Sequence, residues 1–307
     1  MSEAGPHPLL SWKVQIPFWV CTLIWGTTWF VIRGQLGVVP PSWSVTYRFL
    51  IAGCVMFAYA GLTGKPLSLP RGAHLLAMLF GLAQFAFNFN FVYRAEAHIT
   101  SGLVALIFAL LIVPNTIFSR LFLGQRATAR FYLGSAVAMA GIALLFVNEF
   151  RASEGTENVA LGLVLTLLGV FSASAANVMQ ASERIRGLPM ASFLAWGMIW
   201  GALMDGAWAW ITTGPPVAEW TPVYLGGVLY LSIAASAIAF MCYFSVIRLI
   251  GPGPAAYSSI VTPVIAMAIS TAFEGYRWTV FSIAGGLLAM AGLVIAMMAR
   301  RPAVKSG

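Results

Sequence analysis

Charged residues are scarce in this sequence. Of its 307 residues, 17 are basic and 9 are acidic, so charge makes up 8% of the chain, whereas a soluble domain carries roughly 25%. A water-soluble fold of this length needs a charged surface, and too little charge is present to make one. The composition therefore excludes a soluble globular enzyme and a disordered chain, and it leaves a polytopic helical membrane protein.

Cysteine, histidine and aspartate are also rare. The three cysteines lie inside apolar runs, so the sequence offers no disulfide framework and no metal-binding spacing. Asp205 is the only aspartate, and the chain has 3 histidines. No Ser/His/Asp set, no HExxH motif and no GxxxxGK[ST] phosphate loop can be assembled from these residues. The sequence thus predicts no enzyme, no metal, no cofactor and no ATP hydrolysis.

Apolar stretches fill most of the chain, and 60% of its residues are hydrophobic. A helix needs about 20 apolar residues to cross a bilayer, and breaks such as Gly64-Lys65-Pro66 and Gly214-Pro215-Pro216 separate ten such stretches. Because lipid offers no partner to backbone polar groups, each stretch is expected to be helical. The predicted spans run approximately over 15–33, 42–62, 72–94, 98–122, 129–148, 159–182, 190–213, 222–247, 252–273 and 279–299.

Lysine and arginine are distributed unevenly between the two sides of these spans. With a cytoplasmic N-terminus, the inner segments hold twelve of them and the outer segments hold four. The positive-inside rule therefore predicts that both termini are cytoplasmic, and this topology, not nucleic-acid binding, explains the excess of positive charge. Arg48 lies within the second span and is left out of the count.

An internal repeat divides the chain into two halves. Ala138-Met139-Ala140-Gly141 recurs as Ala289-Met290-Ala291-Gly292 at an offset of 151 residues. Upstream of these, Pro114 corresponds to Pro263 at an offset of 149. The halves are predicted at residues 1–150 and 151–307, with five spans each. Because five is odd, the second half must enter the membrane in the opposite sense, as in the inverted repeats of many secondary transporters.

Small residues recur at four-residue spacing in several spans and predict close contacts between helices. These faces are Gly134-x-x-x-Ala138, Gly197-x-x-x-Gly201 and Gly285-x-x-x-Ala289.

A series of short motifs follows the two halves in order. They are Trp25-Gly26, Pro41 with Tyr47-Arg48-Phe49, proline in spans four and nine, Phe122-Leu123-Gly124-Gln125-Arg126 and Phe273-Glu274. Together they resemble the drug/metabolite transporter superfamily, and the EamA-domain family is its most similar branch. That family usually has Glu where this chain has Gln125, although Glu274 keeps the acid in the second half. The resemblance implies export of metabolites, chiefly amino acids, from a bacterial cytoplasm.

Two prolines occupy equivalent positions in spans four and nine. Pro114 and Pro263 each lack an N–H and free the carbonyl four residues earlier, those of Leu110 and Ser259. Interrupted helices at matching places in two halves point to a transporter's binding site. We therefore expect these prolines to shape the cavity and its gating, with a purely structural kink as the alternative.

Polar and aromatic residues inside the spans are the candidates for substrate binding. A zwitterionic amino acid needs polar groups for its carboxylate and ammonium and an apolar wall for its side chain. Asn88 is expected to face the cavity, with a hydrogen bond between packed helices as the alternative. His98 is expected to bind a carboxylate or relay a proton, with a hydrogen-bonded position at the membrane interface as the alternative. Asp205 is interpreted as interfacial. The predicted polar groups are Asn88, Tyr93, His98, Ser101 and Tyr257, and the predicted aromatic walls are Trp25 and Trp200.

The sequence as a whole predicts a ten-span exporter in the bacterial inner membrane that works by alternating access. Its site is expected near the midplane between the halves, lined by spans one, three, four, six, eight and nine. The expected partners are a neutral or aromatic amino acid and the lipid bilayer, and the expected assembly is a monomer or weak dimer. The alternatives are an exporter of nucleobases or drug-like compounds, a membrane enzyme acting on lipid, and a receptor or scaffold that transports nothing.

Overall fold

The computed structural model describes residues 11–124, 128–152, 157–250 and 258–298, and these residues form helices and no strand. Three of the predicted spans are continuous helical runs, each of which contains one short π-helical or 3-10 segment between two α-helical parts. The elements are α1 Trp12–Arg33, α2 Pro41–Leu62, α3 Arg71–Gly81, a π-helical segment Leu82–Phe87, α4 Asn88–Ala95, α5 Ser101–Phe108, a 3-10 turn Ala109–Leu111, α6 Ile112–Leu123, α7 Ala129–Ala152, α8 Glu157–Ala181, α9 Glu183–Arg186, α10 Met190–Thr213, α11 Pro222–Ser232, a second π-helical segment Ile233–Ile238, α12 Ala239–Ile250, α14 Ser258–Phe273 and α15 Val280–Met298.

Several of these helical runs have the length and composition of membrane spans. Six runs are long and apolar enough to cross a bilayer: 12–33, 41–62, 71–95, 101–123, 159–181 and 222–246. Shorter apolar helices cover 129–145, 258–273 and 280–296. The outward surface carries large apolar side chains, such as Leu287 on α15 and Ile211 on α10. A surface of this kind fits a protein that is solvated by lipid.

Local sequence signals account for where individual helices begin and end. Pro41 and Pro222 open α2 and α11, at the position where a missing N–H costs nothing. Thr221 caps α11 by accepting a hydrogen bond from the backbone N–H of Tyr224 at 3.3 Å. Gly124 ends α6 in the left-handed conformation with φ of 67°, which glycine adopts without strain.

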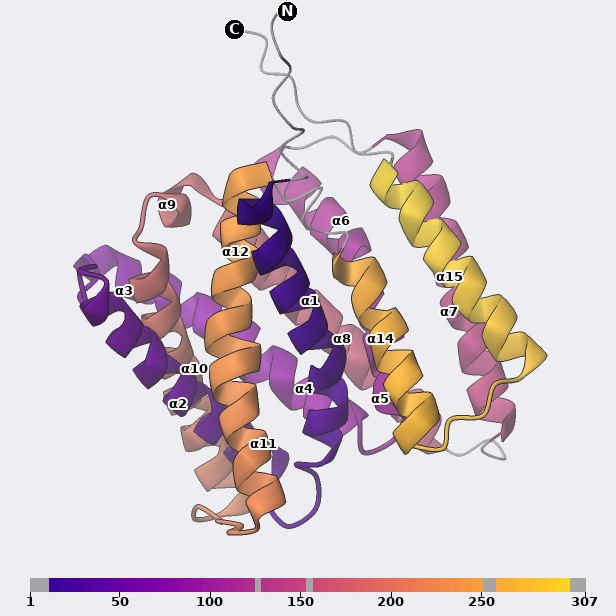
Figure 1. Cartoon of the computed structure of the whole chain (residues 1–307), viewed down its shortest axis with the longest axis horizontal. Coiled ribbons are helices and arrows are strands. Elements are labelled where there is room, and N and C mark those ends of the chain that lie inside the picture. The colour runs from indigo at the N-terminus through magenta and orange to yellow at the C-terminus, as the bar shows by residue number, and fades with distance from the viewer. Residues whose placement is uncertain (1–10, 125–127, 153–156, 251–257, 299–307) are drawn as a thin grey trace, which may run out of the picture.

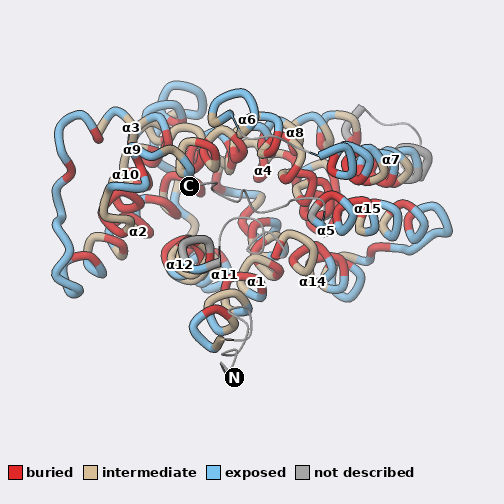
Figure 2. Tube along the Cα trace, turned by 90° about the horizontal axis from the view of Figure 1, so that it is seen from above, coloured by how far each residue is buried: buried red, intermediate tan, exposed pale blue. Residues whose placement is uncertain are grey.

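The helices are arranged in three groups along the long axis of the molecule (Figures 1 and 2). The helices α7 and α15 form a pair at one end, and α2, α3 and α10 gather at the other end. Between these groups lie α1, α4, α5, α8, α12 and α14. Helix α1 begins and α15 finishes at the same end of the bundle, the upper one in Figure 1.

Small residues bring helices into close contact, as their spacing predicts. Gly134 of α7 faces Gly292 of α15, and Gly141 of α7 faces Gly285 of α15, so these two helices run antiparallel. In each case a Cβ atom at the glycine would meet backbone atoms of the opposite helix. A Cβ atom at Gly81, where α3 ends, would likewise meet the backbone of α10 at Gly197 and Gly201. The predicted small-residue contacts are therefore confirmed.

The two π-helical segments occupy matching places in the chain. The first begins at Leu82 and the second at Ile233, and they end at Phe87 and Ile238. The offset is 233 − 82 = 151 residues, which equals the main offset of the sequence repeat. Segments of this kind often mark functional sites, because the wider turn leaves backbone carbonyls available to side chains.

Asp205 lies in a buried polar network, and its predicted place at the level of the membrane interface stays a prediction. Its side chain is 3% exposed and accepts hydrogen bonds from Asn90 Nδ2 at 2.5 Å and Thr46 Oγ1 at 3.2 Å. Arg94 donates to Asn90 Oδ1 at 2.5 Å and to Ser42 Oγ at 3.1 Å. We call Ser42, Thr46, Asn90, Arg94 and Asp205 the Asp205 network. It connects α2, α4 and α10, and the cation of Arg94 comes from a helix far away in sequence from Asp205.

Candidate functional site

A cavity of about 130 Å³ lies in the central group of helices, with residues of both halves in its wall. An apolar cavity of roughly 150 Å³ has room for a benzene ring, so the space fits a small organic group. All six spans that the sequence predicts contribute to the lining, and α2 adds Arg48. The lining comprises Trp25, Thr28, Trp29, Ile32, Arg48, Gln84, Asn88, Phe89, Val92, Ala105, Phe108, Ala109, Leu111, Ala173, Asn177, Phe240, Tyr243, Ser258, Ser259, Thr262 and Pro263.

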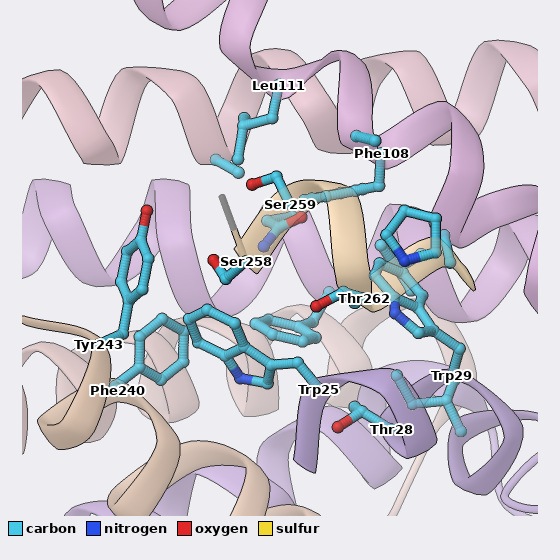
Figure 3. Close-up of a pocket in the computed structure, with 18 of the residues that line it drawn as sticks. Trp25, Thr28, Trp29, Phe108, Leu111, Phe240, Tyr243, Ser258, Ser259 and Thr262 are labelled. Carbon is cyan, nitrogen blue, oxygen red and sulfur yellow. The ribbon is translucent and has the colours of Figure 1, made fainter. Parts of the chain in front are cut away.

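Aromatic side chains form two sides of this cavity (Figure 3). Trp25 packs against Phe240 and Tyr243, with ring centroids 5.4 and 5.0 Å apart. On the other side Trp29 packs against Phe108 at 5.3 Å. The rings hold each other in place, so the walls are preformed surfaces on which an apolar or aromatic side chain can pack.

Arg48 brings a positive charge into the cavity. It is 1% exposed, and its guanidinium lies 4.2 Å from the centroid of the Phe89 ring. Its Nε donates a hydrogen bond to Ser236 Oγ at 3.0 Å. Neither Nη1 nor Nη2 makes a hydrogen bond of standard geometry with a described residue, although the guanidinium interacts with the Tyr93 side chain on its protein side. The end of the guanidinium that suits a carboxylate therefore still has donors to offer a ligand.

Three further polar groups in the cavity wall lack partners among the described residues. They are Trp29 Nε1, Asn88 Oδ1 and Thr262 Oγ1. With Arg48 they form what we call the cavity set. Its members include donors (Arg48, Trp29) and acceptors (Asn88, Thr262), and they come from four different helices. A buried polar group without a partner costs about 1–3 kcal/mol, so four of them around one cavity indicate a place for a polar ligand.

The π-helical segments position two members of the cavity set. In the first segment the Gln84 carbonyl accepts a hydrogen bond from Asn88 Nδ2 at 3.3 Å, which leaves Asn88 Oδ1 directed elsewhere. In the second segment Ser236 Oγ donates to the Leu231 carbonyl, five residues earlier, at 2.8 Å. The same hydroxyl accepts from Arg48 Nε. The backbone irregularity of both segments therefore orients the groups that face the cavity.

The structure brings three of the predicted site residues together in the cavity wall. Trp25, Asn88 and Pro263 all line it. Trp25 also donates from Nε1 to the Ala235 carbonyl of the second π-helical segment at 3.2 Å. Pro114 is buried in α6, directly after the 3-10 turn, and does not line the cavity. The change to 3-10 geometry at Ala109–Leu111 includes the Leu110 carbonyl that Pro114 frees.

The remaining predicted residues that the structure describes do not line the cavity. Tyr93 is fully buried and interacts electrostatically with Arg48, although it does not line the cavity. Ser101 begins α5, and His98 precedes it in the connection from α4. Trp200 packs against Trp196 and His74, both with ring centroids 6.4 Å away, beside α3. Tyr257 lies outside the described residues.

Sequence reasoning missed Arg48, Trp29 and Thr262 as site residues. A signal was available for Arg48, because it is the one basic residue in the middle of a predicted span, and an intramembrane charge suggests a functional site. The charge count set it aside because it belongs to neither face of the membrane. Trp29 and Thr262 had no comparable signal, since nothing in the local sequence separates them from other apolar-span residues.

Comparisons with known proteins agree with the helical membrane architecture. The sequence profile of the EamA-like transporter family matches residues 16–147 and again residues 160–298. The chain therefore belongs to the EamA-like transporter family, whose members are transporters and not enzymes. It is accordingly a multi-pass membrane protein.

Individual relatives cover nearly the whole chain. Protein PagO of Salmonella typhimurium is 26% identical over 96% of this chain and 96% of its own length. The uncharacterized inner membrane transporter YedA of Escherichia coli is 30% identical over 82% of this chain and 80% of its own. A Salmonella typhimurium protein named probable amino-acid metabolite efflux pump is 26% identical over 93% of this chain and 96% of its own length. A crystal structure that is 19% identical aligns with 94% of this chain and 99% of its own at a TM-score of 0.68, which shows the fold alone.

Proposed function

We propose that this member of the EamA-like transporter family exports neutral amino acids, including the large aromatic ones, across the bacterial inner membrane by alternating access. The observation that carries the proposal is the cavity set. The two Nη groups of Arg48 and the Trp29 N–H are placed to bind a carboxylate. Asn88 Oδ1 and Thr262 Oγ1 are placed to accept hydrogen bonds from an ammonium.

The aromatic walls complete the complementarity to an amino acid. The stacked rings around Trp25 and Trp29 offer apolar surface on two sides of the cavity. They contain no group that would select one particular side chain, so several neutral side chains are expected to fit. The name of one relative, probable amino-acid metabolite efflux pump, supports the same substrate class.

The proposed transport cycle rests on ten spans in two inverted halves, residues 1–150 and 151–307. The matching π-helical segments support this arrangement, as does the return of α15 to the end at which α1 begins. The glycine contacts between α7 and α15 are reciprocal: Gly134 faces the counterpart of Gly141, and Gly141 faces the counterpart of Gly134. A pseudo-two-fold relation produces such pairs. We propose a monomer or weak dimer as the working unit, without ATP.

The proposed orientation places both termini in the cytoplasm, because twelve basic residues against four favour it. On a background without the native cysteines, Glu219→Cys should react with a membrane-impermeant thiol reagent added outside sealed cells. Arg126→Cys should stay unreacted until the cells are opened. The reverse labelling pattern would contradict both the orientation and the inverted repeat.

The substrate class can be tested by counterflow, in which unlabelled compound loaded into proteoliposomes drives uptake of labelled phenylalanine. We expect phenylalanine and other neutral amino acids to support counterflow. Phenylalaninamide, which lacks the carboxylate, and hydrocinnamate, which lacks the ammonium, should support it at least about tenfold less, since each loses a charge-assisted contact.

Other outcomes of the same assay would contradict the proposal in identifiable ways. Counterflow of a labelled nucleobase or cationic drug, with no counterflow of labelled phenylalanine, would indicate the alternative exporter. Saturable binding of phenylalanine without any flux would indicate a receptor. Equal activity of the acid and its amide would remove the assigned role of Arg48.

A further inference from the structure

A further cluster of charged groups, with the buried Glu96 at its centre, lies at the end of the bundle where α1 finishes. Arg33, the last residue of α1, donates from Nη1 to the backbone carbonyls of Glu96 at 2.8 Å and Ile99 at 3.1 Å. Glu274 Oε2, just beyond α14, accepts from the Ser101 backbone N–H at 3.1 Å and from Ser270 Oγ at 2.6 Å. These contacts connect the junction of α4 and α5 in the first half to α1 and to α14 in the second half.

Inside this cluster the carboxyl group of Glu96 has no hydrogen-bond partner. Glu96 is 0% exposed, and neither of its carboxyl oxygens is paired with any described residue. Oε1 of Glu274 is likewise buried and has no described partner. The fully buried Tyr93 interacts electrostatically with Glu96, and its hydroxyl also interacts with the Arg48 side chain. Three carboxyl oxygens from two distant positions in the chain are thus left without described partners.

The surroundings of Glu96 and Glu274 favour the neutral form of the Glu96 carboxyl group. Burial raises the pKa of Glu96 well above its ordinary value, and the nearby charge of Glu274 raises it further. The charged groups that act in the opposite sense are Arg33 from α1 and Arg48 from α2. Arg33 uses its Nη1 donor on backbone carbonyls, so the Glu96 carboxylate would have no hydrogen bond to stabilise its charge.

We propose that Glu96 and Glu274 together bind one exchangeable proton, carried by Glu96, and that this proton stabilises the closed contact between the α4–α5 junction and α14. The site is distinct from the cavity, because neither glutamate lines it. A protonated Glu96 can donate to an acceptor such as the free Oε1 of Glu274. Loss of the proton leaves the buried carboxylate of Glu96 and the half-buried carboxylate of Glu274 in mutual repulsion across the boundary between the halves.

The chemistry of the cluster favours a proton over a metal cation. The backbone carbonyls that a cation would require beside the carboxylates already accept hydrogen bonds from the Arg33 guanidinium. A second positive ion placed there would be repelled by that guanidinium. Within the described ranges no group of three or more His, Cys, Asp or Glu side chains converges on a metal position.

The proposal can be tested on the purified full-length protein without any transport assay. Infrared difference spectra between pH 5 and pH 8 should show the loss of a protonated carboxyl band in the wild type. The component of that band that comes from Glu96 should be missing in Glu96→Gln, and its titration midpoint should move down by about one pH unit or more in Glu274→Gln, because the repelling charge is gone. Glu183→Gln, at an exposed carboxylate on α9, is the matched control and should titrate like the wild type.

Thermal unfolding provides an independent measurement with a defined sign. Because the pKa of Glu96 is raised in the folded state, its contribution to stability is fully present below the pKa of an unfolded-chain glutamate and is lost as the pH rises through the raised value. The Tm of the wild type should therefore fall relative to that of Glu96→Gln as the pH increases, and the two should converge at low pH.

Three results would overturn the proposal. The first is a carboxyl band unaffected by Glu96→Gln, and the second is a Tm difference between wild type and Glu96→Gln that does not change with pH. The third is a midpoint that moves when Na⁺ replaces K⁺ at constant ionic strength, which would indicate a metal cation in the site. If Glu96→Gln does not fold, the test rests on Glu274→Gln alone: the titration midpoint of the carboxyl band must move down in this variant, and an unchanged midpoint would overturn the proposal. Failure of the amino-acid counterflow assay would leave this test intact, since no substrate enters it.

Discussion

The protein contains two buried polar regions that differ in how far their groups are paired. In the Asp205 network, Arg94 donates to Asn90 at 2.5 Å and to Ser42 at 3.1 Å, and Asp205 accepts two hydrogen bonds. In the cavity set, Arg48 donates from Nε to Ser236 and interacts with Tyr93, but neither Nη group makes a hydrogen bond of standard geometry with a described residue. Arg94 is half-buried and donates two hydrogen bonds to side chains, whereas the fully buried Arg48 donates one. We infer that the first region holds helices together and the second receives a ligand.

The geometry of α4 explains how the two regions can be neighbours and still differ. Asn88 and Asn90 are two residues apart, so they project from nearly opposite faces of the helix. Asn90 faces α2 and α10, where Ser42 and Asp205 satisfy it. Asn88 faces the cavity, where its Oδ1 has no described partner. Amides of the same type thus serve packing on one face and binding on the other.

The largest difference between the two regions is expected when the arginine of each is replaced and transport and stability are measured. Arg48→Gln should lower phenylalanine counterflow roughly 30-fold or more, because truncating one member of a buried charge pair with the ligand costs about 2–5 kcal/mol. Its thermal stability should be unchanged or higher, since an unpaired buried cation is removed. Arg94→Gln, the matched variant, should instead lower stability. Equal loss of stability in both variants would contradict the comparison.

A second expected effect concerns the stability of the Asp205 network. Asp205→Ala removes the acceptor of Asn90 and Thr46 and the anion near Arg94, which should cost about 3–5 kcal/mol of folding free energy. Denaturation of the purified protein would measure this loss. The phenylalanine rate per folded molecule should stay within about twofold of wild type, and a changed preference between phenylalanine and its amide would place Asp205 in the binding site.

A smaller effect is expected for the polar groups that contact the ammonium. Asn88→Ala should lower counterflow about five- to tenfold, as the loss of one hydrogen bond to a charged group predicts. His98→Ala should change the rate much less, because His98 does not line the cavity. Trp278→Ala is the control, because the Trp278 indole lies on the exposed surface, where its N–H donates a hydrogen bond to Thr271 at 2.9 Å. A larger loss in His98→Ala than in Asn88→Ala would reverse the assignment.

The smallest effect is expected for the two prolines. Pro263 lines the cavity and Pro114 does not, so Pro263→Ala should slow counterflow two- to threefold, in keeping with a changed helix bend of less than about 1 kcal/mol, and Pro114→Ala should slow it less. Both variants should fold, because alanine restores a helix hydrogen bond. Wild-type rates in both, measured at equal reconstituted amounts, would assign the prolines a structural role only.

The sequence predicted the membrane class, the all-helical fold and three residues that line the cavity, and the reasons can be identified. Span positions follow from apolar length, which lipid requires of any crossing helix. Trp25, Asn88 and Pro263 stood out as a tryptophan, an amide and a helix-interrupting proline that are predicted to lie inside spans. Tyr93, His98, Ser101 and Trp200 stood out equally, but their direction depends on helix rotation and packing, which local sequence does not encode. The structure places them outside the cavity wall.

By itself the sequence determined that this chain is a membrane protein, since charged residues make up 8% of it, too few for the surface of a water-soluble fold. It also determined where helices can approach closely, because only small residues such as Gly134 and Gly292 admit a facing backbone. Only the tertiary structure decided which buried polar groups are paired. Arg48 meets Ser236, 188 residues later, and Asp205 meets Asn90, 115 residues earlier. Hydrogen bonds between such distant residues depend on how the helices pack, and that packing separates a satisfied network from an open binding site.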